Sequence, residues 1–170
     1  MQRHLIKIVP LLLIAILYLY LNNAEQTKAN DGSPLFLITK VVDGDTFWIL
    51  NEKNEKEKIR LIGVNAPESR KTGRKDVECF GKEASDYAKK LLLNQRVRLE
   101  YDVQRTDKYG RTLAYVYLED GTFVNDLLVK KGYAHVATYP PNVKYVDIFR
   151  NSEKYARKKE LGLWNKNNCN

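Results

Sequence analysis

Five short segments rich in β-branched and aromatic residues place the tightest constraint on how this chain can fold. The first two end at turn signals, Asp43 with Gly44 after the first and the polar stretch 51–57 after the second. The last two alternate apolar and polar residues with the period of a half-buried strand. We expect the five strands at residues 35–42, 46–50, 58–64, 96–101 and 112–118.

Three further segments have helical character. Residues 81–94 place apolar or small side chains three and four positions apart, which is the spacing of an amphipathic helix. Helices are also predicted at 124–131 and 147–161, because Gly132 and Gly162 follow them. The order of elements predicts an α+β, mainly β chain: a small antiparallel barrel capped by about three helices. The five-stranded OB-fold barrel has this strand count.

Residues 1–24 have the pattern of a targeting segment. A basic start precedes the uncharged, mostly apolar run 8–21, which is shorter than the roughly 20 residues of a bilayer span and fits a secretory signal peptide. We therefore expect cleavage and a secreted, extracellular domain. Asn22 makes a poor cleavage site, however, so the alternative is a membrane anchor at residues 5–21 with the domain outside. A polar linker at 25–34, a domain at 35–165 and a tail at 166–170 would follow.

The chain has two cysteines, Cys79 and Cys169. An even cysteine count in an exported chain favours one disulfide, and the alternative is two free thiols. A structural zinc site is disfavoured because it needs four ligands and His135 is the only other soft ligand after residue 24. The formal net charge of +8 favours polyanion partners such as nucleic acids, but it also promotes solubility and is weak evidence alone.

Carboxylates and arginines gather in three motifs: DGDT at 43–46, RLIGVNAPE at 60–68 and DKYGR at 107–111. Carboxylates suit a hard cation and guanidinium groups suit a phosphate, so together they favour metal-assisted phosphodiester hydrolysis. Alone, Asp-Gly-Asp is more often a plain turn. Strand alternation would place Arg60 on the same face as Ile62 and Val64, where it needs an anion, either a structural carboxylate or a phosphate.

The chain resembles the staphylococcal nuclease, or thermonuclease, family. The matching segments, in the family's order and spacing, are VVDGDTFWI, IRLIGVNAPE, GKEAS, QRTDKYGRTLAYVY and EKYARKKELGLW. The resemblance covers about residues 35–164 and implies a monomeric OB-fold nuclease. It also implies a calcium-dependent endonuclease that hydrolyses DNA and RNA by water attack, with the 5′ oxygen leaving to give 3′-phosphate products.

The resemblance also implies roles for individual residues. Arg60 and Arg111 would bind the scissile phosphate, and Glu68 would act on the attacking water as general base or would orient it. Asp45 would bind calcium directly, with Asp43 as a nearby carboxylate. The remaining implied contacts are the backbone carbonyl of Ala66 to calcium, and Lys108, Tyr109 and Tyr139 to the nucleotide.

Asn65 departs from the family, which commonly has a calcium-binding aspartate at this position. The amide oxygen can still bind a hard cation, but one negative charge is lost. We therefore expect weaker calcium binding, or a preference for another divalent ion. The rival function is a catalytically weak or inactive OB-fold module that binds nucleic acid or protein. A remoter option is an exported structural domain.

Overall fold

The structure of the protein is a computed structural model that describes residues 32–71, 73 and 76–169. The predicted signal peptide or anchor and nearly all of the polar linker lie outside these residues. None of the described helices has the length and hydropathy needed to span a bilayer.

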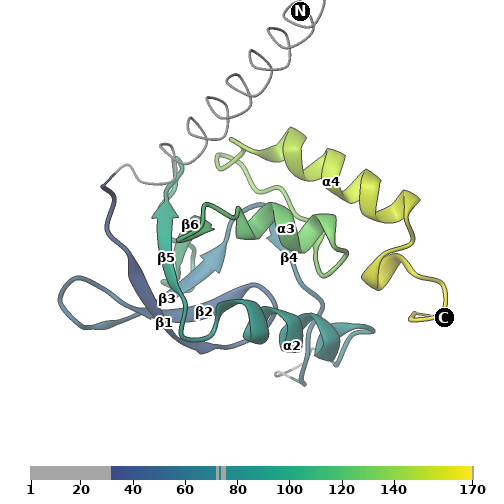
Figure 1. The fold of residues 1–170 in the computed structure, drawn as a ribbon, viewed down its shortest axis with the longest axis horizontal. Helices are drawn as coiled ribbons and strands as arrows, with labels where there is room; N and C mark the ends of the chain where they lie inside the picture. Colours follow the sequence, from purple (N-terminus) through teal and green to yellow (C-terminus); the bar gives the residue numbers. More distant parts are fainter. Residues whose placement is uncertain (1–31, 72, 74–75, 170) are drawn as a thin grey trace, which may run out of the picture. The chain divides into compact units, whose positions relative to one another are not determined.

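A closed five-stranded barrel forms the centre of the domain (Figure 1), as predicted. Its strands are joined in the order β1-β2-β3-β6-β5, and β5 closes the ring by pairing with β1. The pairing of β3 with β6 is parallel, so the prediction of a fully antiparallel barrel is wrong. An odd number of strands cannot alternate in direction around a closed ring, and at least one pairing must be parallel. The barrel strands are β1 Phe36–Val41, β2 Thr46–Leu50, β3 Lys56–Leu61, β5 Arg96–Glu100 and β6 Thr112–Leu118.

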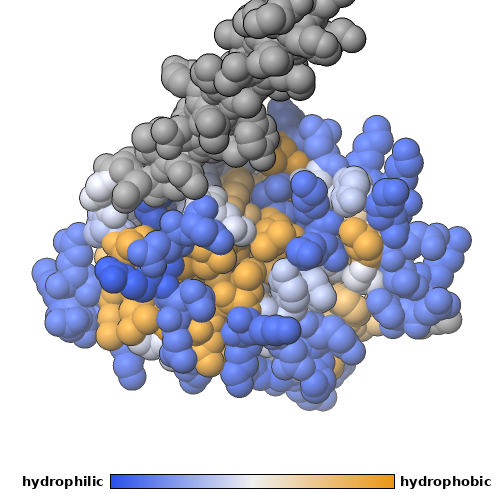
Figure 2. Space-filling view, in the orientation of Figure 1, coloured by the Kyte–Doolittle hydropathy of each residue, from blue (hydrophilic) through white to orange (hydrophobic). Residues whose placement is uncertain are grey.

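Three helices cover the barrel at the predicted places: α2 Gly81–Leu92, α3 Val124–Lys130 and α4 Val146–Lys158. Helix α2 packs on β1 and buries Ala84, Ala88 and Leu92, which recur every four residues. Helices α3 and α4 lie side by side (Figure 1), and the 3-10 helix Gly162–Trp164 follows α4. On the face shown in Figure 2, hydrophobic residues gather over the barrel strands, whereas the helix surfaces are mostly hydrophilic.

The third strand ends three residues earlier than predicted. Gly63 turns the chain with φ of +78°, and a Cβ there would lie 2.4 Å from a ring carbon of Phe149. Beyond this turn, β4 Val64–Asn65 pairs with β7 His135–Val136, and neither of these two-residue strands was predicted. The prediction that Arg60, Ile62 and Val64 lie on one face of a strand is therefore wrong, because a turn interrupts the strand between them.

Cys79 and Cys169 form the predicted disulfide, with their Cα atoms 5.7 Å apart. Cys79 lies two residues before α2, so the bond joins the entrance of this helix to the C-terminal residues. The bond closes a loop whose ends are 90 positions apart. On the chain-entropy account, such a loop restricts the unfolded chain strongly.

Replacing both Cys79 and Cys169 with serine should lower the free energy of unfolding by about 2–4 kcal/mol. Urea denaturation of the native chain, with and without a reducing agent, measures the effect. The double variant serves as the control, because a reducing agent should not change its midpoint. An unchanged unfolding free energy in the double variant would show that the disulfide does not stabilise the domain.

Candidate active site

The ten residues predicted to bind the cation, the phosphate or the nucleotide all line one cavity of about 520 Å³. The segments after β1, β3 and β4 line this cavity together with the 104–111 loop and the turn at Tyr139. The residues are Asp43, Asp45, Arg60, Asn65, Ala66, Glu68, Lys108, Tyr109, Arg111 and Tyr139.

Asp45 directly precedes β2, and its carboxylate is buried. Its Oδ2 atom accepts a hydrogen bond from the Ala66 amide at 2.7 Å and pairs with Arg60 Nη2 at 3.1 Å. Its Oδ1 atom accepts from the Thr46 hydroxyl at 3.0 Å. Gly44 permits this close approach, because a Cβ there would lie 2.4 Å from the Ala66 Cβ. The Asp-Gly-Asp turn therefore fixes a buried carboxylate against the segment after β4.

A second carboxylate lies beside the first. Asp43 Oδ1 accepts a hydrogen bond from the Asp45 amide at 3.2 Å. Burial is the largest cause that raises the pKa of Asp45 from 3.8 to about 6, with Arg60 opposing the shift and Asp43 adding to it. The site therefore holds negative charge at a cost that a bound cation would reduce.

Asp45 gives the free energy of unfolding a pH dependence that can be measured without a cation. The folded carboxyl keeps its proton up to about pH 6, whereas the unfolded one, with the model-peptide pKa of 3.8, loses it earlier. The folded state thus binds more protons in this window, and the stability due to Asp45 is lost as pH rises through it. In EDTA, we expect the unfolding free energy of the native chain to fall by up to about 3 kcal/mol relative to Asp45→Asn. Denaturant titrations across this range test it, and parallel pH curves for the two proteins would contradict it.

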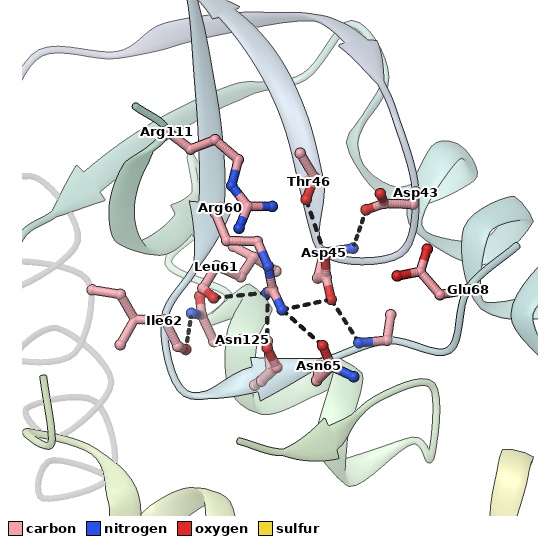
Figure 3. A network of polar contacts seen from close by, with 12 residues as sticks. Asp43, Asp45, Thr46, Arg60, Leu61, Ile62, Asn65, Glu68, Arg111 and Asn125 are labelled. Atoms are coloured by element: carbon pink, nitrogen blue, oxygen red, sulfur yellow. Dashed lines mark hydrogen bonds and ion pairs between the residues drawn. The ribbon is translucent and has the colours of Figure 1, made fainter. Parts of the chain in front are cut away.

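The guanidinium of Arg60 contacts four protein oxygens (Figure 3). Nη1 donates to the main-chain carbonyls of Leu61 at 3.0 Å and Val64 at 2.8 Å. Nη2 contacts the Asp45 carboxylate and donates to Asn65 Oδ1 at 3.0 Å. The partner carboxylate that the sequence left open is therefore Asp45. The two carbonyls fix the plane of the guanidinium, and Nε and Nη2 form its other edge.

Arg111 is held by Asp107, a residue of the DKYGR motif to which sequence reasoning gave no role. Arg111 Nε and Nη2 each lie 2.6 Å from Asp107 Oδ2, and the Arg111 amide donates to Asp107 Oδ1 at 3.0 Å. Burial acts to raise the pKa of Asp107, but these contacts and the Tyr109 amide lower it below its usual value. This pair could have been found in the sequence, because an Asp lies four residues before an Arg with a glycine turn between them.

Glu68 is positioned by its backbone. Its amide donates to Glu78 Oε2 at 2.9 Å, and its carbonyl accepts from the Glu78 amide at 2.9 Å. Gly81 lets the first turn of α2 approach, because a Cβ there would lie 2.2 Å from the Glu68 carbonyl oxygen. Figure 3 shows the Glu68 carboxylate directed toward Asp43 and Asp45.

Two exposed aromatic rings also line the cavity. The residues Tyr109 and Tyr139 are both 71% exposed, although each lines the cavity. Asn142, which is buried, ties the Tyr139 turn to the other loop: its Oδ1 accepts from the Gln104 amide and its Nδ2 donates to the Gln104 carbonyl, both at 2.8 Å. Sequence reasoning missed this amide pair, and a single buried Asn in a loop has no periodic signal.

The donors at the Asp45 end of the cavity suit a hard cation, because every one of them is an oxygen. Within the described part of the chain, no three His, Cys, Asp or Glu side chains gather closely enough to hold a metal alone. A cation here would therefore also need the amide oxygen of Asn65, which is exposed, or the carbonyl of Ala66. With Asp45 buried beside Asp43, the chemistry of this set fits a hard divalent cation.

Comparisons with known proteins agree with this geometry. The profile of the family described as Staphylococcal nuclease homologue matches residues 58–166. A thermonuclease of Staphylococcus intermedius is 41% identical over 160 residues, covering 92% of this chain and 94% of that protein. A thermonuclease of Staphylococcus hyicus is 42% identical over 80% of this chain and 79% of its own length. Endonuclease YncB of Bacillus subtilis (strain 168) is 38% identical over 85% of this chain and 72% of its own length. With a barrel, a cavity and a sequence that agree, the chain belongs to the staphylococcal nuclease family.

Proposed function

We propose that this protein is an endonuclease that hydrolyses phosphodiester bonds in DNA and RNA with the help of a divalent cation, Ca²⁺ being the first candidate. The observation that carries the proposal is the single cavity in which two guanidinium groups face the carboxylates of Asp43, Asp45 and Glu68. Such a site can hold a phosphate, a cation and a water molecule together. The names of the relatives, thermonuclease and endonuclease, support the same activity.

The two arginines would both bind the scissile phosphate. Asp107 occupies Nε and Nη2 of Arg111, which leaves Nη1 for a phosphate oxygen. A phosphate could bind at the edge of Arg60 that is formed by Nε and Nη2. It would then replace either Asp45 or Asn65 as an acceptor of Nη2. Both groups would then stabilise the negative charge that grows on phosphorus in the transition state.

Glu68 would take a proton from the water that attacks phosphorus, as the P–O5′ bond breaks and the leaving 5′ oxygen takes a proton from solvent, to which Glu68 then releases its own. The products would carry 3′-phosphate groups. Asp45, Asn65 and the Ala66 carbonyl would hold the cation, with Asp43 close by. When bound, the cation would supply positive charge next to the phosphate.

Degradation of plasmid DNA and of RNA tests the proposal directly. Each substrate is incubated with the protein over a range of Ca²⁺ concentrations and with EDTA, and the fragments are resolved on gels. We expect cleavage that needs the cation, and 3′-phosphate ends that a 3′-phosphatase removes. Binding without degradation at every concentration of Ca²⁺, Mg²⁺ and Mn²⁺ would favour the inactive binding module instead.

Changing Asn65 to Asp should tighten Ca²⁺ binding by about tenfold, because the added charge strengthens a hard-cation site. Isothermal titration calorimetry without substrate measures the affinity independently of activity. Asn151→Asp makes the same chemical change on an exposed position of α4 and should leave the affinity unchanged. Equal affinities for Asn65→Asp and the native chain would show that Asn65 is not a ligand.

We also propose that the domain acts outside the cytoplasm. The disulfide supports this proposal, since such bonds persist in oxidising compartments. Fractionation of expressing cells, with intact-mass analysis of the recovered protein, tests both export and cleavage. A full-length chain in the membrane fraction would favour the anchor over the signal peptide.

A further inference from the structure

A tryptophan lies between two lysines on the outer face of the barrel. In the sheet register, Trp48 of β2 is opposite Lys40 of β1 on one side and opposite Lys58 of β3 on the other. Its neighbours Phe47 and Ile49 are fully buried in the core, so Trp48 faces outward, where it is partly exposed. The Lys58 Nζ lies 5.7 Å from the centroid of the Trp48 ring.

This arrangement continues from the catalytic cavity. Alternate residues of a strand share a face, so Arg60, Lys58 and Lys56 form a row on the outside of β3, spaced by about 7 Å. Arg60 lines the cavity, and Lys58 is the next member of the row. Lys56 and Lys40 are exposed. We call Lys40, Trp48, Lys56 and Lys58 the outer strip.

The charge of the outer strip is not neutralised by neighbouring acids. No ion pair found in the described part of the chain involves one of its lysines. Glu57, between Lys56 and Lys58 in sequence, points to the other side of β3, where it accepts a hydrogen bond from the Thr112 hydroxyl. Two lysines therefore flank one partly exposed indole, and Lys56 lies farther along β3 opposite Leu50.

Lysines beside an exposed aromatic ring are the elements with which proteins bind single-stranded nucleic acid without sequence preference. The ring stacks on a base, and the cations contact the phosphates on either side. The outer surface of an OB-fold sheet is also where this fold commonly binds oligonucleotides. A polyanion that enters the cavity at Arg60 would meet Lys58 and Trp48 next.

We infer that the outer strip binds the single-stranded segment that flanks the scissile phosphate, with Trp48 stacked on a base and Lys40 and Lys58 on the adjacent phosphates. The inference rests on the proposed nuclease function. It predicts that long substrates gain affinity from contacts that a dinucleotide is too short to make.

Binding is measured in EDTA, so that cleavage does not interfere, with a fluorescently labelled oligothymidylate of about 16 nucleotides. Trp48→Leu should weaken binding by about 5- to 100-fold, and Trp48→Phe should restore part of the loss because it retains a ring. Lys58→Ala should reduce the slope of log affinity against log salt by about 0.7. Lys154→Ala removes the same charge from an exposed position of α4 and should have little effect.

Cleavage of a thymidine dinucleotide, assayed with Ca²⁺, separates the outer strip from the catalytic site. All four variants should cleave it at the native rate, because it occupies only the cavity. Oligonucleotide affinities that equal those of the native chain in Trp48→Leu and Lys58→Ala would overturn the inference while leaving the nuclease function intact. If the native chain cleaves neither this dinucleotide nor plasmid DNA in the presence of Ca²⁺, the proposed function itself fails. Should Trp48→Leu not fold, the salt slope of Lys58→Ala decides alone.

Discussion

Replacing Arg60 with lysine is expected to lower kcat for phosphodiester hydrolysis by about 10²–10³-fold, the loss typical of removing one donor to a transition-state oxyanion. Arg60 Nη1 binds two main-chain carbonyls, of Leu61 and Val64, while the opposite edge faces the cavity. A lysine ammonium lacks this fork, so it cannot hold both carbonyls and still present two parallel donors to a phosphate.

The structural role of Arg60 has to be separated from its effect on the reaction. The side chains of Arg60 and Asp45 are 12% and 8% exposed, so the pair is buried, and removing one partner can cost about 3–5 kcal/mol. Lysine keeps the charge, which makes Arg60→Lys a better test than Arg60→Ala. Single-turnover cleavage well below the melting temperature gives the rate, and urea denaturation gives the stability.

Arg150→Lys is the matched control, because Arg150 is an exposed residue of α4 that does not line the cavity. Its kcat should equal that of the native chain. Arg111→Lys should lose activity with little loss of stability, since its pair with Asp107 is more exposed than the Arg60 pair. A kcat for Arg60→Lys within a few-fold of the Arg150→Lys value would exclude Arg60 from binding the reacting phosphate.

The barrel strands and the helices could be predicted because each leaves a local signal, which is an apolar period, a run of branched residues before a turn, or a glycine that ends a helix. The two-residue strands β4 and β7 have no such period, and only the tertiary fold brings Asn65 opposite His135. The end of β3 was missed for a related reason. Gly63 reads as part of an apolar run, and the ring of Phe149, far along the chain, sets the space available at this turn.

The residues of the site also fall into two groups: some could be placed together from a local motif, and others only from the tertiary fold. Asp43 and Asp45 are neighbours in sequence, so a local motif was enough to place them together. The acceptors that orient Arg60 include main-chain carbonyls, which have no sequence signature. The pairing of Asn142 with Gln104 likewise joins residues 38 positions apart and depends on the closed barrel. Sequence therefore identified the groups that line the cavity better than those that hold them in place.

Changing Glu68 to Gln should lower kcat by about 10²–10⁴-fold, which is the usual contribution of a general base. Glutamine keeps the shape of the side chain and one oxygen, but it cannot take a proton from water. The backbone of Glu68 is fixed by Glu78 and by the close approach of Gly81, so the substitution should not move the segment. Glu83→Gln, on an exposed position of α2, makes the same change in charge outside the cavity and should retain native kcat.

A water-orienting role predicts a different pattern from a base. A base must accept a proton from water, which an amide cannot do, so a base role predicts that Glu68→Gln loses most of kcat. An orienting residue needs only a hydrogen-bond acceptor, which glutamine retains, so that role predicts a much smaller loss. Gly81→Ala adds an independent test: its Cβ would lie 2.2 Å from the Glu68 carbonyl oxygen and displace the backbone without changing the carboxyl. If the position of the carboxylate matters, Gly81→Ala should lower kcat although the carboxyl is unchanged, whereas near-native activity in Glu68→Gln would exclude Glu68 as the general base.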